Sequence, residues 1–394
     1  MDDNPSEGED DQNEISSGAG GDVDFEEGSD EEEIQFDKSL AATHSYMGPG
    51  LVAVRRRSVL EAGWRGRVPV TAHTGAIFPG ETVPLLFSSL HDAEMVSRLI
   101  AQDKLFGLLF PDESGTMVSG YGVLCEVFET RVSERETAGA EGAALTFKAR
   151  ATHRFRLVER AQPMHAFARM RPAEVRVLPE AARERPAPRP PRPLRQLRAA
   201  LTPWPLFLHD LFGYERVRDL LRDHFHFIPP ERLPDDPVSL SFWVASNLAL
   251  SARDRLALFK VDDALLRLHM ALRFIARKSV LCCAACMSEV ARREHILAMS
   301  SEGVHANFTN LGGYMHDVVT VSRASNTRLS GRPSADYSWF PGYAWTIAVC
   351  RSCATHLGWR FDAIKRNLRP LRFFGLCRNY MQPRADDDDE PDRL

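Results

Sequence analysis

Residues 338–353 read SWFPGYAWTIAVCRSC, and the two cysteines of this stretch match a second pair upstream. Two residues separate Cys350 from Cys353, and two also separate Cys283 from Cys286. Such a gap lets a tight turn aim both thiolates at one ion, so two pairs complete a closed tetrahedral zinc site. A site closed on every side predicts a structural metal that ties together the two ends of one domain. Unrelated buried or redox cysteines are the alternative.

Cysteine usage also bears on the cell compartment. The chain has seven cysteines, an odd number and too few for a disulfide scaffold, so reduced thiols or metal ligands are expected. Cys282 beside Cys283 leaves an ambiguity of register. Because Cys282 would lengthen the first spacing to three residues, we assign Cys283 as the ligand.

Aromatic residues crowd the stretch that carries the second cysteine pair. Trp339 and Trp345 flank a Pro-Gly turn, which predicts a hairpin that presents both indoles to one cavity. Trp359 follows, with Tyr343 and Phe361 nearby. Three rings set at angles form an aromatic cage that suits a quaternary ammonium or a small flat ring. A tryptophan-rich hydrophobic core beneath a small zinc domain is the alternative.

The first half of the chain has the pattern of a β-rich domain. Pro84 cannot donate to a ladder, so the apolar run 83–87 predicts an edge strand, and 91–99 predicts a short helix. Further strands are predicted over residues 106–110, 121–128, 145–151, 155–158 and 174–178.

Beyond residue 200 the apolar period changes from two to between three and four, which predicts helices. One apolar stripe runs from Leu258 to Ile275, and Ser251 with Asp254 forms a capping box that would start this helix. Two more helices are predicted around 208–221 and 242–250. Residues 201–277 are therefore interpreted as a small helical bundle.

Charge is distributed very unevenly along the 394 residues. Residues 1–37 hold sixteen acids and no Lys or Arg, and residues 385–394 hold six acids against one Arg. With a net charge of −5 for the whole chain, the rest carries +16 (−5 + 16 + 5). The segment 183–198 holds six Arg and five Pro, which indicates extended, solvated chain. No aromatic residues interleave these arginines, so nucleic-acid binding is not expected.

These features predict an α+β protein. The boundaries are a disordered acidic tail over 1–37, a β-rich domain over 38–200, the helical bundle over 201–277, a zinc domain over 278–382 and a second acidic tail over 383–394. No apolar run reaches the roughly 18 residues of a membrane span, and no signal peptide is recognised. We expect a soluble, intracellular protein that does not bind membranes.

The cysteine and tryptophan set, in this order, resembles the thalidomide-binding (CULT) domain of the cereblon family. Residues 313–316, 331–334 and 356–361 fit the same pattern. Residues 77–86 and 146–158 resemble the N-terminal substrate-recognition domain of Lon proteases. Residues 36–48 resemble the N-terminal arm of the cereblon family. The resemblance covers nearly everything from residue 36 to residue 380. It implies a Lon N-terminal-like domain with a helical bundle, followed by an all-β CULT domain with one structural Zn²⁺.

The resemblance also implies a function. Family members are substrate receptors of a cullin-4 RING ubiquitin ligase, found in cytoplasm and nucleus, whose helices dock on the adaptor damaged-DNA-binding protein 1. The aromatic cage would take a cyclic imide, either the glutarimide of thalidomide-like drugs or a C-terminal cyclic imide on a damaged protein. The implied ligand-binding residues are Trp339, Trp345, Trp359, Phe361, Tyr337, Tyr343 and Asn310, with His316 facing ligand or recruited substrate. No catalytic residue is implied.

One position departs from the family pattern, because Tyr337 stands where family members often have His.

Two other functions compete with the imide receptor. A methionine sulfoxide reductase of the B type would use Cys377 as its nucleophile. A methyl-lysine reader would need carboxylates beside the cage, and only Asp336 and Asp317 are near in sequence.

Overall fold

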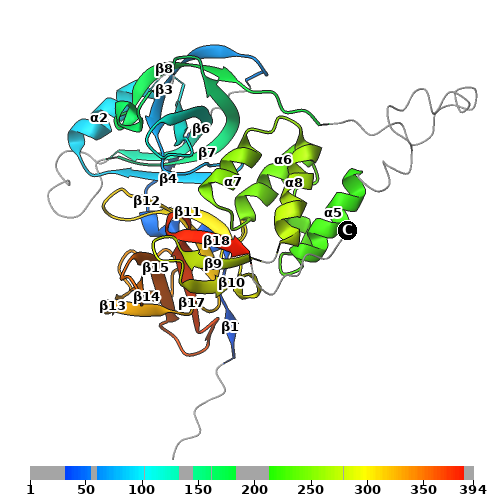
Figure 1. Cartoon of the computed structure of the whole chain (residues 1–394). Coiled ribbons are helices and arrows are strands. Elements are labelled where there is room, and N and C mark those ends of the chain that lie inside the picture. The colour runs from blue at the N-terminus through cyan, green and yellow to red at the C-terminus, as the bar shows by residue number, and fades with distance from the viewer. Residues whose placement is uncertain are drawn as a thin grey trace, which may run out of the picture.

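The structure is a computed structural model, and it describes residues 32–54, 60–101, 103–132, 145–160, 162–182, 213–277 and 279–385. Three modules are visible in Figure 1: a β-barrel, helices at its side, and a second β-module below both. Residues 1–31 of the predicted acidic tail, the segment 183–198, residues 201–212 of the bundle and residues 386–394 lie outside the described residues. Among those described, no helix is long and apolar enough to cross a membrane.

The barrel is built from five strands that close on themselves. They are β3 (Arg65–Ala72), β5 (Leu105–Pro111), β6 (Val118–Val132), β7 (Leu145–Leu157) and β8 (Arg171–Val177). The sheet order β6-β5-β3-β8-β7, together with the pairing of β6 with β7, closes the ring. The predicted strands 145–151 and 155–158 are one long strand, whose register with β6 shifts between Leu124 and Cys125. Such a shift lets a long strand bend around a barrel.

Two short strands extend the barrel at its edges. β4 (Thr82–Phe87) pairs with β7 alone, which confirms the edge strand predicted from Pro84. β2 (Val52–Ala53) pairs with β6. The predicted helix 91–99 is α2 (Leu90–Leu99), and its Ser89 side chain caps the helix by accepting from the Asp92 N–H.

Four helices stand beside the barrel. They are α5 (Tyr214–His224), α6 (Pro237–Asn247), α7 (Ala252–Phe259) and α8 (Ala264–Ala276). Ser251 caps α7 as predicted, since its side chain accepts from the Asp254 N–H. The single helix predicted from the apolar stripe is wrong, because the chain turns after Phe259 and begins α8 at a new cap. There Asp263 accepts from the Leu266 N–H, and an Asp in this role favours a helix start over a helix interior.

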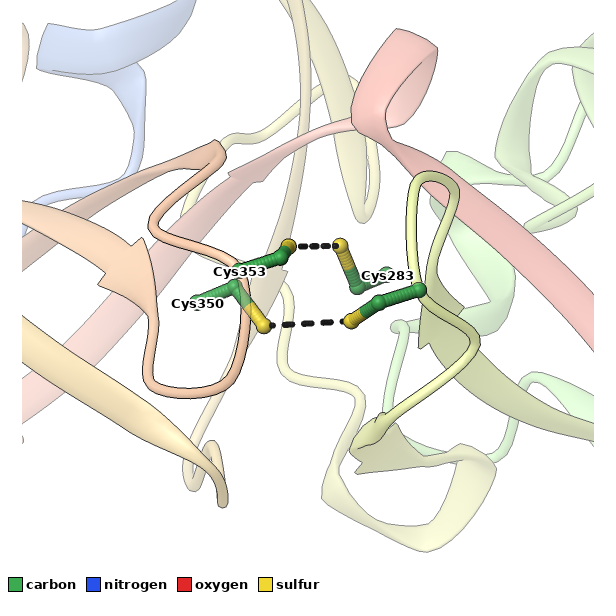
Figure 2. Close-up of side chains that lie close together, drawn as sticks. Cys283, Cys350 and Cys353 are labelled. Atoms are coloured by element: carbon green, nitrogen blue, oxygen red, sulfur yellow. Dashed lines mark hydrogen bonds between the residues drawn. The ribbon is translucent and has the colours of Figure 1, made fainter.

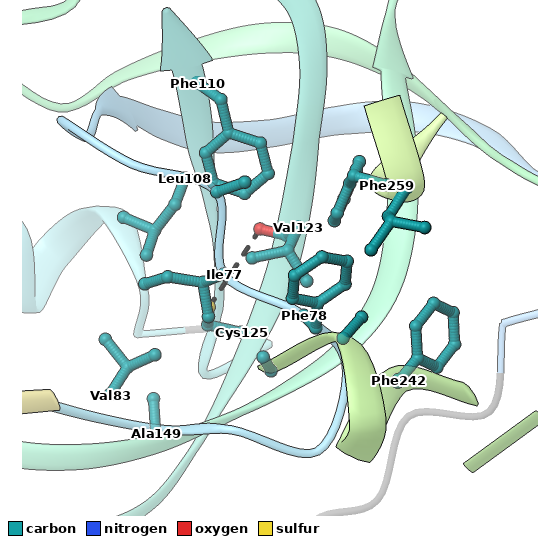
Figure 3. Packing of buried hydrophobic residues seen from close by; sticks show 14 of the residues in the cluster. Ile77, Phe78, Val83, Leu108, Phe110, Val123, Cys125, Ala149, Phe242 and Phe259 are labelled. Carbon is teal, nitrogen blue, oxygen red and sulfur yellow. Dashed lines mark hydrogen bonds between the residues drawn. The ribbon is translucent and has the colours of Figure 1, made fainter. Parts of the chain in front are cut away.

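One hydrophobic core joins the helices to the barrel. Phe78 at the barrel edge packs against Phe242 of α6 and Phe259 of α7, with ring centroids 6.3 and 5.7 Å apart. Phe110 of β5 meets Phe259 edge-on at 4.9 Å (Figure 3). A separate cluster, which includes Val70, fills the barrel interior. The helices are therefore packed directly against the barrel wall.

Residues 279–385, here called the zinc module, consist of strands, short 3₁₀ helices and turns. One sheet has the order β10 (Glu289–Arg292), β9 (Ser279–Cys283) and β18 (Met381–Ala385). The other has the order β11 (His305–Thr309), β12 (Met315–Val321), β17 (Arg372–Cys377), β15 (His356–Ala363), β14 (Tyr343–Cys350) and β13 (Thr327–Ser334). The remaining short elements are α1 (Ser39–Ala42) and the 3₁₀ helices η1 (Ser45–Met47), η2 (Met164–Phe167), η4 (Pro230–Arg232), η5 (Arg293–His295) and η6 (Arg378–Tyr380).

Both predicted acidic tails need correction at their inner ends. β1 (Ile34–Gln35) pairs in parallel with β16 (Leu368–Arg369), and the Glu33 carboxylate lies 2.5 Å from the Arg369 guanidinium. Phe36 is buried against the zinc module. Residues 383–385 belong to β18. Long-range pairing orders these short segments, and local composition carries no sign of it.

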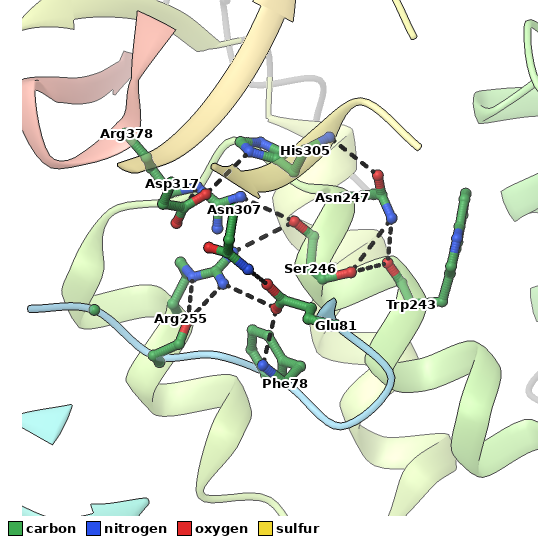
Figure 4. A network of polar contacts seen from close by, with 12 residues as sticks. Phe78, Glu81, Trp243, Ser246, Asn247, Arg255, His305, Asn307, Asp317 and Arg378 are labelled. Atoms are coloured by element: carbon green, nitrogen blue, oxygen red, sulfur yellow. Dashed lines mark hydrogen bonds and ion pairs between the residues drawn. The ribbon is translucent and has the colours of Figure 1, made fainter. Parts of the chain in front are cut away.

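Buried polar groups connect all three modules at their junction (Figure 4). Glu81, just before β4, accepts from Arg255 of α7 at 3.3 Å and from the Asn307 amide of β11 at 3.0 Å. Across the junction, Asp317 of β12 forms an ion pair with Arg378 at 3.2 Å. Burial raises the pKa of Glu81, and the charge of Arg255 opposes that rise. The junction therefore depends on charges that must stay paired.

Candidate metal centre and aromatic site

The four predicted cysteines meet at one point. Cys283 Sγ lies 3.6 Å from Cys353 Sγ, and Cys286 Sγ lies 3.5 Å from Cys350 Sγ. All four sulfurs lie within 4.8 Å of one another, and Figure 2 shows side chains from the two turns pointing toward a common centre. These distances fit four thiolates about one tetrahedral ion. Cys282 is absent from the cluster, which supports the register chosen from the sequence.

The surroundings of the cluster favour thiolate ligands at its exposed side. The Thr355 hydroxyl lies 3.2 Å from Cys353 Sγ, and this contact lowers the Cys353 pKa to about 6. Ser288 likewise lowers the pKa of Cys286. Burial raises the pKa of Cys283 to about 11, so this thiol needs a bound cation to ionise at neutral pH. The four sulfurs and their hydrogen-bond partners fit a structural zinc.

The tryptophan cage is assembled across β14 and β15. Trp345 of β14 is paired with Phe361 of β15, so both side chains stand on one face of the sheet. Trp359, two residues before Phe361, stands on that same face and is a diagonal neighbour of Trp345. Diagonal neighbours are about 7–8 Å apart, which leaves room for one flat ring between two indoles. Both tryptophans are half-buried.

Trp339 forms the third side from the loop before β14. Its ring centroid lies 4.7 Å from that of Trp359 at 74°, and Phe308 stacks behind it at 5.0 Å and 11°. The Trp339 Nε1–H donates to the Thr309 carbonyl at 3.0 Å. The Trp345 Nε1–H donates to the Asp336 carbonyl at 2.8 Å. These bonds fix the edges of both indoles. Trp339 is 6% exposed, whereas Trp345 is half-buried and offers more of its ring face.

Two polar side chains lie beside the tryptophans. The Asn310 amide nitrogen is 3.3 Å from His316 Nε2, and the His316 ring lies 5.1 Å from Trp359 and 5.7 Å from Trp339. Burial, and then the charge of His356, lower the His316 pKa to about 4. His316 is therefore neutral at pH 7 and adds a hydrogen-bonding edge to the site without a charge.

The two predicted tyrosines have different positions. Tyr337 is half-buried with a φ of 52°, its ring 5.2 Å from Tyr46. Its hydroxyl is buried without a partner among the described residues, and burial raises its pKa to about 12. The prediction that Tyr343 lines the cage is wrong. Tyr343 is fully buried, packs on Phe36, and donates its hydroxyl to the Pro370 carbonyl at 2.8 Å.

Two of the three residues required by the competing functions, Cys377 and Asp317, are not available for them. Cys377 is 3% exposed, and burial, with the nearby charge of Asp317, raises its pKa far above the usual thiol range. Such a thiol is not a nucleophile at neutral pH. Asp317 is buried and paired with Arg378, so it cannot face a cation in the cage. A reductase is therefore not supported, and of the two acids that a methyl-lysine reader would use only Asp336 is exposed.

Several contributors to the site were missed in the sequence. Phe308 and Thr309 support Trp339, His356 packs on Trp359 at 4.8 Å, and the Tyr46 hydroxyl accepts from the Thr309 N–H. The register of β14 with β15 shifts between Gly358 and His356. A regular strand pattern therefore would not place His356 beside Trp359. Tyr46 comes from a distant part of the chain, and its position depends on tertiary packing alone.

Comparison with known proteins shows the family. The chain is 33% identical over 387 residues to "Protein cereblon" of Danio rerio, a match covering 89% of this chain and 88% of that protein. The chain belongs to the cereblon family. The cereblon of Xenopus tropicalis is 31% identical, covering 91% and 87%. That of Drosophila grimshawi is 30% identical, covering 90% of this chain and 55% of that protein.

Two family models divide the cereblon-family chain. The "ATP-dependent protease La (LON) substrate-binding domain" matches residues 68–277, and "Yippee zinc-binding/DNA-binding /Mis18, centromere assembly" matches residues 279–387. A crystal structure of a Lon N-terminal domain protein from Xanthomonas campestris aligns with a TM-score of 0.34 at 19% identity, covering 53% of this chain and 98% of that one. The two family models and the cysteine cluster establish the α+β class, the Lon N-terminal-like domain and the all-β zinc module with its four-cysteine site.

Proposed function

We propose that this protein is the non-catalytic substrate receptor of a cullin-4 RING ubiquitin ligase and that its tryptophan cage binds cyclic imides. The receptor captures a protein that carries such a group, or a thalidomide-like glutarimide, and presents the protein for ubiquitination by other subunits. Membership in the cereblon family supports the receptor role.

The geometry of the tryptophans carries the imide assignment. A glutarimide is a neutral six-membered ring whose methylenes pack on aromatic faces and whose two carbonyls and N–H need fixed polar partners. Trp345 and Trp359 offer half-buried faces on one side of the sheet, and Trp339 stands at 74° to Trp359. Of the two acids near the cage in sequence, Asp317 is buried in an ion pair, and the carboxylate of Asp336 accepts from the Ser334 hydroxyl at 3.2 Å. A neutral ligand fits better than a quaternary ammonium.

Backbone groups around Tyr337 and Trp339 would supply the polar contacts. Tyr337 has a left-handed backbone conformation, with φ at 52°. Contacts from main chain would survive the exchange of His for Tyr at this position. Asn310 and His316 would face the ligand or the recruited protein.

The helices beside the barrel are the proposed docking site for damaged-DNA-binding protein 1. α5 has an exposed polar face that includes Arg216 and Arg222, and Leu220 is 38% exposed. A receptor of this kind would act in cytoplasm and nucleus.

Tryptophan fluorescence titrated with a glutarimide tests the imide assignment. The ligand sits against three indoles, so the wild-type signal is expected to change and saturate. Trp345→Ala is expected to abolish saturable binding. The control is Trp64→Phe, which changes a tryptophan of the barrel and should bind as the wild type does. An unresponsive wild type, or normal binding by Trp345→Ala, would refute the cage.

A further inference from the structure

A second hollow lies between the helices and the zinc module, and none of the cage residues lines it. Its volume is about 570 Å³. Apolar side chains from both modules form much of its wall, namely Phe225, Leu248, Leu250, Ile275, Leu281 and Ile296. Small-molecule sites have volumes of this order and occur preferentially at domain interfaces.

Arg293 is the polar centre of this cavity. Its guanidinium donates to the Ile275 carbonyl and to the His224 ring, and the side chain is half-buried. Among the described residues no carboxylate forms an ion pair with it, whereas its neighbour Arg292 pairs with Glu289 at 2.8 Å. Burial lowers the Arg293 pKa, and no acid raises it. A desolvated cation without a counter-charge is costly and favours an anionic partner.

The other titratable groups of the cavity do not supply that counter-charge. Burial, and then the charge of Arg293, lower the His224 pKa to about 3, so His224 is neutral at pH 7. His226, Asp223 and Glu294 lie at the solvent-exposed rim, where water and salt screen their charges. Arg292 also lines the cavity, but it is paired with Glu289. The interior therefore combines apolar walls with one cation, Arg293, that has no acidic partner among the described residues.

We propose that this cavity binds a small organic carboxylate with an aliphatic or aryl body. The carboxylate pairs with Arg293, whose planar fork suits two parallel hydrogen bonds, and the body packs on the wall formed by Leu248, Ile275 and Ile296. Such a ligand contacts α5, α8 and the zinc module together, so it stabilises their junction. This site does not depend on the proposed imide function.

Calorimetric titration of the full chain with phenylvalerate, against its neutral amide phenylvaleramide, tests the proposal. The acid is expected to bind more tightly than the amide. Arg293→Gln keeps a hydrogen-bond donor but removes the charge. It should therefore weaken binding of the acid by about tenfold or more and leave binding of the amide unchanged. Arg328→Gln is the matched control, because Arg328 is exposed on β13; it should bind both compounds as the wild type does.

A second variant covers the case in which Arg293→Gln fails to fold. Ala249 lines the cavity. Ala249→Leu fills part of the cavity and leaves every charged residue in place, so it should weaken binding of the acid and of the amide alike. Excess glutarimide should displace neither compound. The proposal is overturned if the acid binds no more tightly than the amide, if Ala249→Leu binds normally, or if glutarimide competes.

Discussion

Gly358 shows how a single residue positions the tryptophan cage. It precedes Trp359 in β15 and has a φ of 146°, a conformation that residues with a side chain rarely adopt. A Cβ at this position would lie 2.0 Å from the Gly375 carbonyl oxygen of β17. The close approach of the two strands, which holds the Trp359 indole over the sheet, therefore requires glycine here.

Gly358→Ala is expected to lower the free energy of unfolding by about 3 kcal/mol, because backbone strain and a backbone clash combine. Urea denaturation measures this change. Gly331→Ala is the control, since Gly331 also has a positive φ, of 84°, but no atom within 4 Å of the added Cβ; it should cost about 1 kcal/mol. Equal costs for the two variants would show that the contact with Gly375 is unimportant.

At the scale of elements, the break between α7 and α8 determines the shape of the helical module. The apolar stripe predicted one continuous helix, yet Asp263 begins a second one. The same turn lets Ala264 donate its N–H to the Ala181 carbonyl at 2.8 Å, and it brings Asp262 within 2.9 Å of the buried Arg154 of the barrel. The cap therefore fixes how the helices meet the barrel.

Asp263→Ala should destabilise the protein by about 1 kcal/mol, because the first turn of α8 loses the acceptor for the Leu266 N–H. Thermal unfolding followed by circular dichroism measures the loss. Asp263→Asn keeps a capping oxygen and is expected to stay close to the wild type. If Asn and Ala proved equally damaging, the charge of Asp263 would matter more than its capping bond.

At the scale of the whole molecule, the junction network makes the three modules one unit. Glu81, Arg255 and Asp317 come from three different modules and are all largely buried. Burial opposes the charge of Asp317, yet His305 and Arg255 hold its pKa below the usual range. Ionised Asp317 therefore favours the folded state above the pKa of the unfolded carboxyl, and this contribution is lost as pH falls through the folded pKa.

Glu81→Gln is expected to lower the free energy of unfolding by about 3 kcal/mol, because it leaves the Arg255 charge buried without its Glu81 partner. Glu113→Gln is the matched control: the exposed pair of Glu113 with Arg253, 3.7 Å apart, should contribute less than about 1 kcal/mol. Urea denaturation, followed both by fluorescence and by circular dichroism, should give one transition for the wild type and for Glu113→Gln. Separate transitions in Glu81→Gln alone would show that the network couples the modules.

The features that could be predicted from the sequence are those that depend on short-range contacts along the chain. The cysteine pairs, the edge strand at Pro84 and the cap at Ser251 depend on residues close in sequence, and motifs or patterns describe such contacts. Tyr343 was misplaced because its burial depends on Phe36, far away in the chain. The junction of Glu81 with Asn307 joins residues 226 positions apart, which no local pattern encodes. The family resemblance supplied the tryptophan set that local rules left open between a cage and a core.

The pairing of β1 with β16 has a consequence for biosynthesis. Ile34 leaves the ribosome early, but its strand partner Leu368 is made only after almost all of the described chain. Loop closure over such a distance is slow, so Phe36 stays without its aromatic neighbours while the barrel forms. The aromatic pocket can reach its final shape only after translation has passed β17, and a nascent chain arrested earlier would hold its zinc module open.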